Sequence, residues 1–228
     1  MVHAPRNALA APPLDVDELC FRARGLDGLT IGELARRLGV TLPDEPRRAK
    51  GVVGELVELA LGATAGSLDL PDFPQLGVEL KTVPVDEQGR VTESTYVCAI
   101  DLDAIQHAEW RGSRVRRKLA CVLWMPVQAA KQAILSERHL GTPLLWRMRG
   151  EAEAAIEADW RALVGRIAVG GIDEISAHLG EVLQIRPKAR SASERVVVRG
   201  ADGVKVETVR RGFYLRAAFT EAVLWGEM

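Results

Sequence analysis

The sequence predicts an α/β or α+β domain, in which helices are mixed with a central, partly antiparallel sheet. Two observations predict this class. Helical periodicity with capping signals recurs along the chain, and short runs of apolar and β-branched residues lie between the helices. We see no linker long enough to separate independent domains in the 228 residues. We therefore expect a single domain over residues 1–228, with a loose Ala- and Pro-rich tail at residues 1–13.

The first third of the chain is predicted to be helical. A helix is expected at about residues 15–24. Thr30 and Glu33 fit a capping box, which opens a second helix that ends at Gly39. Prolines then enforce a loop before a third helix at about residues 50–61.

The rest of the chain alternates between strands and helices. Short apolar runs with turn residues between them predict strands at 76–83, 92–102, 117–127, 143–147 and 181–189, a turn at 86–90 and a hairpin at 194–209. Helical periodicity predicts helices at 151–168 and 215–226, and the Gly-Phe-Tyr segment at 212–214 is expected to form a turn.

Composition excludes several classes of protein. The chain is 47% hydrophobic and 27% charged, as is usual for a globular protein with a sizeable core. Its apolar runs are shorter than the ~18 residues that a membrane span needs, and its N-terminus lacks the apolar stretch of a secretory signal. Three widely spaced cysteines suggest buried thiols in a reducing compartment, so we expect a cytoplasmic protein without a disulfide or zinc framework.

Charge is distributed unevenly along the chain. Residues 1–110 hold 10 Lys and Arg against 18 Asp and Glu, whereas residues 111–228 hold 20 against 13. An acidic half joined to a basic half suggests a cation site beside a surface for a polyanion. The alternative is chance placement of solvated charges.

The stretch GVELKTVPV at residues 77–85 contains the first candidate site. On a strand, Glu79 and Lys81 point to one face and the apolar neighbours of Glu79 point to the other. Asp72 lies in the loop before this strand. Two converging carboxylates suit a hard divalent cation, and Lys81 would stand beside a phosphate that such an ion binds. The alternative is an ordinary salt bridge on a strand surface.

Two further patterns leave their interpretation open. On the predicted helix at 50–61, Glu55 and Glu58 share the face opposite the apolar stripe. Solvation is the simpler reading for Glu55, while for Glu58 the periodicity alone favours neither solvation nor a site. The run RGSRVRRK at 111–118 has five basic residues in eight, which suits contact with phosphates or a solvated face.

The sequence resembles the PD-(D/E)xK nucleases, and most specifically the MutH family of DNA mismatch repair endonucleases. Six blocks carry this resemblance in the order and spacing of the family, over nearly the whole chain: KGVVGELVELALGATAGS (50–67), DFPQLGVELKTVPVD (72–86), VLWMPV (122–127), GTPLLW (141–146), LQIRPKA (183–189) and RGFYLRAAFT (211–220). The resemblance implies an α/β fold of the restriction-endonuclease type, with a central mixed sheet flanked by helices and two arms around a DNA cleft.

The resemblance also implies a role for single residues. Asp72, Glu79 and Lys81 match the catalytic triad of the family, and Glu58 matches an additional acidic residue that completes or tunes the metal site. The other matching residues are implied to contact DNA: Lys50 and Lys118 near the backbone, Tyr96 as an aromatic near the DNA, Arg186 and Lys188 as readers of GATC, and Tyr214 as the sensor of adenine methylation.

The expected activity follows from the same resemblance. It is Mg²⁺-dependent nicking, with Mn²⁺ as a substitute, 5′ of the G on the unmethylated strand of a hemimethylated GATC site. MutL, loaded by MutS at a mismatch, is expected to activate the enzyme. The enzyme itself is expected to act as a monomer. The chain departs from the family at Arg117, Ala120 and Cys121, and at position 96, where Phe is usual. These departures leave open which residues contact the DNA backbone, but they do not affect the expected catalytic chemistry.

The sequence disfavours three rival functions. The segment at 29–40 resembles the first helix of a helix-turn-helix repressor, but prolines stand where its recognition helix would begin. A free-standing GATC restriction enzyme would cut both strands without a partner, and a chain of one domain without a dimerisation module disfavours it. A catalytically inactive DNA-binding scaffold is disfavoured because all four active-site positions hold the expected residues.

Overall fold

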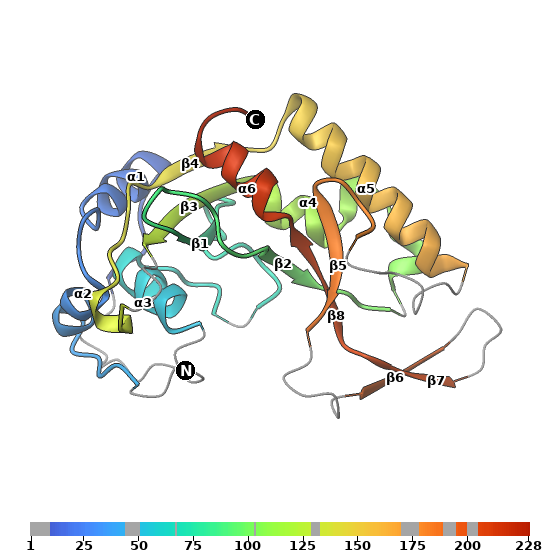
Figure 1. Cartoon of the computed structure of the whole chain (residues 1–228), viewed down its shortest axis with the longest axis horizontal. Coiled ribbons are helices and arrows are strands. Elements are labelled where there is room, and N and C mark those ends of the chain that lie inside the picture. Colours follow the sequence, from blue (N-terminus) through green and yellow to red (C-terminus); the bar gives the residue numbers. More distant parts are fainter. Residues whose placement is uncertain are drawn as a thin grey trace. The chain divides into compact units, whose positions relative to one another are not determined.

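The computed structural model describes residues 10–43, 51–66, 68–102, 104–128, 133–169, 178–188, 195–199 and 205–228. The chain divides into two compact units, each with its own sheet (Figure 1). Unit 1 contains Met1–Glu93 and Ala120–Arg147, and unit 2 contains Ser94–Leu119 and Met148–Met228. The described helices are all too short or too polar to cross a membrane.

Three helices form the first part of unit 1, as predicted. They are α1 (Val16–Arg24), α2 (Ile31–Arg37) and α3 (Val52–Leu61). The expected capping box of α2 is present, because Thr30 Oγ1 accepts the Glu33 N–H and Glu33 accepts the Thr30 N–H in return. Helix α3 ends at Gly62, whose φ of 79° is strained for any residue with a side chain.

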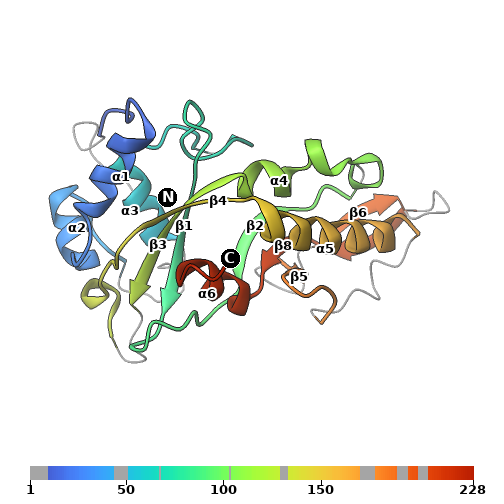
Figure 2. The ribbon, with the colours of Figure 1, turned by 90° about the horizontal axis from the view of Figure 1, so that it is seen from above.

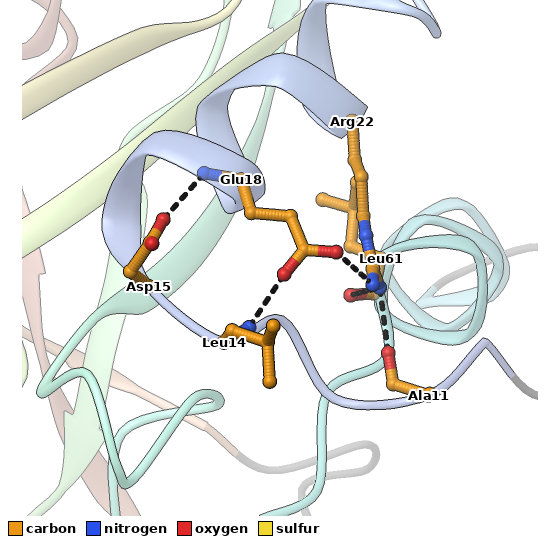
Figure 3. A network of polar contacts seen from close by, with 6 residues as sticks. All are labelled: Ala11, Leu14, Asp15, Glu18, Arg22 and Leu61. Atoms are coloured by element: carbon orange, nitrogen blue, oxygen red, sulfur yellow. Dashed lines mark hydrogen bonds and ion pairs between the residues drawn. The ribbon is translucent and has the colours of Figure 1, made fainter.

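The chain before α1 is fixed to unit 1 by Arg22 (Figure 3). Its guanidinium donates to the Ala11 carbonyl at 2.6 Å and pairs with Glu18 at 2.5 Å. Glu18 in turn accepts the Leu14 N–H at 2.7 Å. A Cβ on Gly62 would lie 2.4 Å from the Ala11 oxygen, so a glycine is needed where this segment crosses the end of α3.

The sheet of unit 1 has the order β1-β3-β4 and is mixed. Its strands are β1 (Glu79–Val85), β3 (Cys121–Gln128) and β4 (Leu144–Arg147), with β1 parallel and β4 antiparallel to β3. Figure 1 shows α1, α2 and α3 beside this sheet, and buried apolar residues of all three helices share one core with β1 and β3. A mixed sheet flanked by helices is therefore confirmed.

The sheet of unit 2 is antiparallel, with the order β2-β8-β5. Its strands are β2 (Thr95–Ala99), β8 (Arg211–Leu215) and β5 (Leu183–Pro187). Helix α5 (Gly150–Ala168) lies alongside β5 (Figure 2), and α6 (Ala217–Leu224) follows β8. The predicted hairpin is present as β6 (Arg195–Arg199) and β7 (Lys205–Val209).

Two predicted elements are wrong. Residues 117–119 were expected to begin a strand, but they end α4 (Arg114–Leu119), which buries Val115 and Leu119 one turn apart. The Gly-Phe-Tyr segment at 212–214 was expected to be a turn, but it lies in β8, the central strand of its sheet. Short 3₁₀ turns lie within some of the described connections, at η2 (Ile105–His107), η3 (Trp110–Gly112) and η4 (Leu135–Glu137).

Unit 2 contains a buried carboxylate with a structural role. Asp159 on α5 is 9% exposed and accepts the backbone N–H groups of three successive residues, Glu181, Val182 and Leu183, at 2.7–3.0 Å. Gly180 makes this approach possible, since its φ is 84° and a Cβ there would lie 3.3 Å from the carboxyl carbon. The start of β5 is thus fixed to α5.

Candidate active site and nucleic-acid interface

Strand β1 places a carboxylate and an ammonium group side by side, as predicted. Glu79 is only 3% exposed, and its Oε1 accepts a hydrogen bond from the Lys81 ammonium at 2.5 Å. Val78 and Leu80 are buried in the core on the opposite face. A buried carboxylate is costly unless it is paired, so the Lys81 charge is what allows Glu79 to lie here.

The loop before β1 folds back and brings Asp72 to the strand. Phe73 and Val78 exchange backbone hydrogen bonds of 2.9 and 3.3 Å, which closes a tight turn that Gly77 supports with a φ of 65°. Asp72 Oδ2 then accepts the Leu80 N–H at 2.8 Å. Asp72 is therefore attached to the residue that lies between Glu79 and Lys81.

Helix α3 brings a third carboxylate to this place. The helix packs against β1, and a Cβ on Gly54 would lie 3.7 Å from Thr82 Oγ1 and 4.0 Å from Glu58 Oε1, both ordinary contact distances. Burial, followed by the negative charges of Asp72, Glu55 and Glu79, raises the pKa of Glu58 to about 7, although the positive charge of Lys81 opposes the rise. The structure therefore brings together all four residues for which the sequence analysis predicted catalysis.

This cluster has the donor chemistry of a divalent-cation site. Its ligands are carboxylate oxygens, and their mutual repulsion at Glu58 is the kind that a cation relieves. Among the described residues, however, no group of three or more His, Cys, Asp or Glu side chains is arranged to hold one ion. The arrangement therefore fits a metal held by one or two carboxylates with water and phosphate, as Mg²⁺ often is.

In unit 2, four of the predicted DNA-binding residues share one face of the sheet β2-β8-β5. Tyr96 on β2 pairs with Tyr214 on β8, and their rings lie 5.3 Å apart in an edge-to-face arrangement. The Arg186 guanidinium lies 6.0 Å from the Tyr214 ring centroid. Lys188 donates to the Tyr96 hydroxyl at 2.5 Å, with its ammonium 4.0 Å from the ring centroid.

The two faces of this sheet differ in chemistry. The face opposite the tyrosines is apolar and buried, with Leu183, Ile185 and Phe213 among its residues. The tyrosine face exposes Arg186 and Lys188, and burial raises the pKa of Tyr214 while Arg186 opposes that rise. Two aromatic rings beside two cations can stack on bases and donate hydrogen bonds to them.

Two residues that build this face, Gly212 and Gln184, were not predicted from the sequence. A Cβ on Gly212 would lie 2.9 Å from Tyr96 Cε2 and 3.0 Å from the Cys98 carbonyl oxygen, so only glycine leaves room for the ring. Gln184 is buried and donates to Ser94 Oγ at 2.8 Å on the same face. The available signal for Gly212 was a glycine beside two aromatic residues, which indicates a close approach in a strand.

The remaining predicted residues are not placed in either cluster. Lys50 lies outside the described residues. Lys118 lies in α4 of unit 2, within the basic run. Part of that run is engaged within unit 2, because Arg116 pairs with Glu153 at 2.9 Å and Arg114 donates to the Ala99 carbonyl at 3.3 Å.

Comparison with known proteins establishes the family. The model of a family described as "DNA mismatch repair enzyme MutH" matches residues 61–159. The chain is 45% identical to the DNA mismatch repair protein MutH of Salmonella typhimurium (strain LT2) over 216 residues, 95% of this chain and 94% of that protein. This chain belongs to the MutH family. The MutH of Haemophilus influenzae (strain PittGG) is 44% identical over 214 residues, 93% of this chain and 95% of its own.

Membership extends across both clusters. The matches to MutH proteins cover nearly the whole of the two units, so the carboxylate cluster of unit 1 and the tyrosine face of unit 2 both belong to the MutH-like chain. The rival interpretation as a helix-turn-helix repressor is thereby excluded.

Proposed function

We propose that this protein is the endonuclease of methyl-directed DNA mismatch repair. In this proposal it nicks the unmethylated strand 5′ of the G in hemimethylated GATC sites. MutL activates it, after MutS has recognised a mismatch. The observation that carries the proposal is the cluster of Glu58, Asp72, Glu79 and Lys81 in a chain of the MutH family.

The carboxylates of unit 1 supply the binding site for the metal. Asp72 and Glu79 would hold Mg²⁺, with Mn²⁺ as a substitute, and Glu58 would complete or tune the site. When bound, the cation supplies positive charge to the phosphodiester and lowers the pKa of its water. The raised pKa of Glu58 supports this assignment, because burial and then the repulsion of the neighbouring carboxylates disfavour a negative charge that a cation would stabilise.

Lys81 acts on the reacting groups. Its ammonium is fixed by Glu79, so its charge stays beside the place where negative charge grows on the phosphate. From there it orients the attacking water and donates to a phosphate oxygen. Water attacks phosphorus in line, the 3′ oxygen leaves, and the products are a 5′-phosphate and a 3′-hydroxyl on one strand.

The tyrosine face of unit 2 would read the DNA. Arg186 and Lys188 offer donors for the acceptor atoms of guanine in the major groove. Tyr214 would contact adenine, where an N6-methyl group clashes with the ring or displaces a hydrogen bond. Lys50 and Lys118 would contact the DNA backbone. The proposal requires both units to engage one duplex, as the two arms expected from the family would.

A nicking assay tests this function. A duplex with one hemimethylated GATC site, labelled on each strand, is incubated with Mg²⁺ or EDTA, with and without MutL. We expect cutting of the unmethylated strand alone, loss of cutting in EDTA and faster cutting with MutL. Cutting of both strands without a partner would indicate a restriction enzyme, and binding without cutting under all conditions would indicate an inactive scaffold.

A further inference from the structure

The lysine of the tyrosine face is held by its neighbours. Lys188 lies one residue beyond β5, where its N–H still donates to the Arg210 carbonyl at 2.7 Å. Its ammonium donates to the Tyr96 hydroxyl at 2.5 Å and lies 4.0 Å from that ring centroid. The backbone and the ammonium of this exposed residue are thus both held by hydrogen bonds, although a lysine side chain has several freely rotating bonds.

The ring that holds Lys188 is itself fixed. Tyr96 packs edge-to-face on Tyr214, with an angle of 64° between the ring planes. Beneath it lies Gly212, which leaves no Cβ in the space that Tyr96 Cε2 occupies. The sheet therefore fixes the position of the Tyr96 hydroxyl. Through its hydrogen bond, this hydroxyl fixes the position of the Lys188 ammonium.

A fixed ammonium differs in function from a mobile one. A lysine that samples many rotamers attracts phosphates at any position, and it loses rotamer entropy when it is ordered. An ammonium that is ordered before binding points a donor at one place on a base edge. Ordering thus favours discrimination between bases over general attraction to DNA.

We propose that Tyr96 is a positioning residue that sets base specificity by fixing Lys188 through its hydroxyl group. This inference rests on the proposed function and adds to it. The reader of the base is the pair of Lys188 and Tyr96, rather than the lysine alone. The hydroxyl carries the effect, because a phenylalanine would keep the ring contacts with Tyr214 and Gly212 but would not accept the hydrogen bond.

Equilibrium binding to two duplexes tests the inference. One duplex contains GATC and the other has a single changed base pair in that site, and both are titrated in EDTA so that cutting does not interfere. We expect Tyr96→Phe to lower the ratio of the two affinities about three- to tenfold, the effect of one lost hydrogen bond. The slope of log affinity against log salt should match that of the wild type, because no charge is removed.

Lys188→Met provides the comparison. It should lower both the affinity ratio and the salt slope, the latter by about one phosphate equivalent if the ammonium also meets the backbone. In the Lys188→Met background, Tyr96→Phe should have no further effect on the ratio, since its action passes through the lysine. Tyr214→Phe removes a neighbouring hydroxyl without touching this hydrogen bond, so its effect should add to that of Lys188→Met.

The outcomes separate the two proposals. A wild-type protein without preference for GATC would overturn the proposed function, and this inference with it. A wild-type preference that Tyr96→Phe retains in full would overturn this inference alone. Equal losses from Tyr96→Phe in both backgrounds would also overturn it, since the hydroxyl would then act independently of Lys188. Near-ultraviolet circular dichroism confirms that the variant keeps its aromatic packing.

Discussion

The carboxylate cluster of unit 1 and the tyrosine face of unit 2 use the same strand alternation in opposite ways. In unit 1, the polar face of β1 is turned inward, where Glu79 is 3% exposed and depends on Lys81. In unit 2, the polar face of the sheet exposes Arg186 and Lys188, which lie beside aromatic rings. Hydrolysis benefits from charges shielded from water, whereas recognition of bases needs donors that reach outward.

The two units also differ in how they use a buried carboxylate. Asp159 in unit 2 accepts three backbone N–H groups and has only a structural part to play. Glu79 in unit 1 faces Lys81 and adds to the electrostatic field around Glu58. Burial alone therefore does not distinguish these two carboxylates, whereas their partner groups do.

Removal of Glu79 should have the largest effect on activity. We expect Glu79→Ala to lower nicking of a hemimethylated duplex by about 10³-fold or more, since it removes the proposed metal ligand and the partner that fixes Lys81. DNA binding in EDTA should persist. Thr30→Ala is the control in the same unit, because loss of that helix cap costs about 1 kcal/mol of stability but is remote from the chemistry. Lost binding in a folded Glu79 variant would contradict the role.

Removal of the Asp159 charge should have the largest effect on stability. We expect Asp159→Asn to lower the free energy of unfolding by about 2–3 kcal/mol, because an amide satisfies fewer of the three donors at the start of β5. Glu157→Gln on the same helix is the control. It breaks only an exposed pair with Arg161 and should change stability by about 0.5 kcal/mol or less. Urea unfolding measures both, and equal effects would refute the distinction.

A side chain at Gly212 should disturb the tyrosine face moderately. An added Cβ would lie 2.9 Å from Tyr96 Cε2 and 3.0 Å from a backbone oxygen. Gly212→Ala should therefore cost about 1–2 kcal/mol and weaken binding to GATC more than to other DNA. Gly165→Ala on α5 is the control, because its Cβ meets nothing within 4 Å and alanine favours a helix. Unchanged near-ultraviolet dichroism in Gly212→Ala would argue against the packing.

The last expected effect concerns pH. The folded pKa of Glu58 is raised from 4.5 to about 7, so the folded chain retains a proton that the unfolded chain releases. Metal-free protein should therefore lose stability as pH rises from about 4.5 to about 7, and Glu58→Gln should remove this part of the loss. Urea midpoints in EDTA across this range provide the measurement. The same slope in both proteins would show that Glu58 is not responsible.

Local chemistry in the sequence was enough to predict much of unit 1. The capping box at Thr30 marks a helix start, and strand alternation alone puts Glu79 beside Lys81. Helical periodicity left Glu58 open, because it identifies the apolar stripe but not what covers the other face. Only the packing of α3 on β1, which brings Glu58 near Asp72, Glu79 and Lys81, decides that question.

Unit 2 was harder to predict because its site depends on register between distant strands. Tyr96 and Tyr214 meet only because β2 pairs with β8, and no short-range pattern specifies that pairing. The glycine and flanking arginines of RGFYL indicated a turn, yet Phe213 and Tyr214 favour a strand, and the central place in the sheet decided the outcome. The helical spacing of Val115 and Leu119 in α4 was not recognised, because the residues between and around them are mostly basic.

The path of the chain between the units has a consequence for synthesis on the ribosome. Unit 1 is interrupted by Ser94–Leu119, and its central strand β3 comes only after that interruption. Strand β1, which contains Glu79 and Lys81, therefore cannot pair with β3 until part of unit 2 has been translated. A fragment that stops before residue 120 would expose the edge of β1 to other chains, so truncated products of this gene should be prone to aggregation.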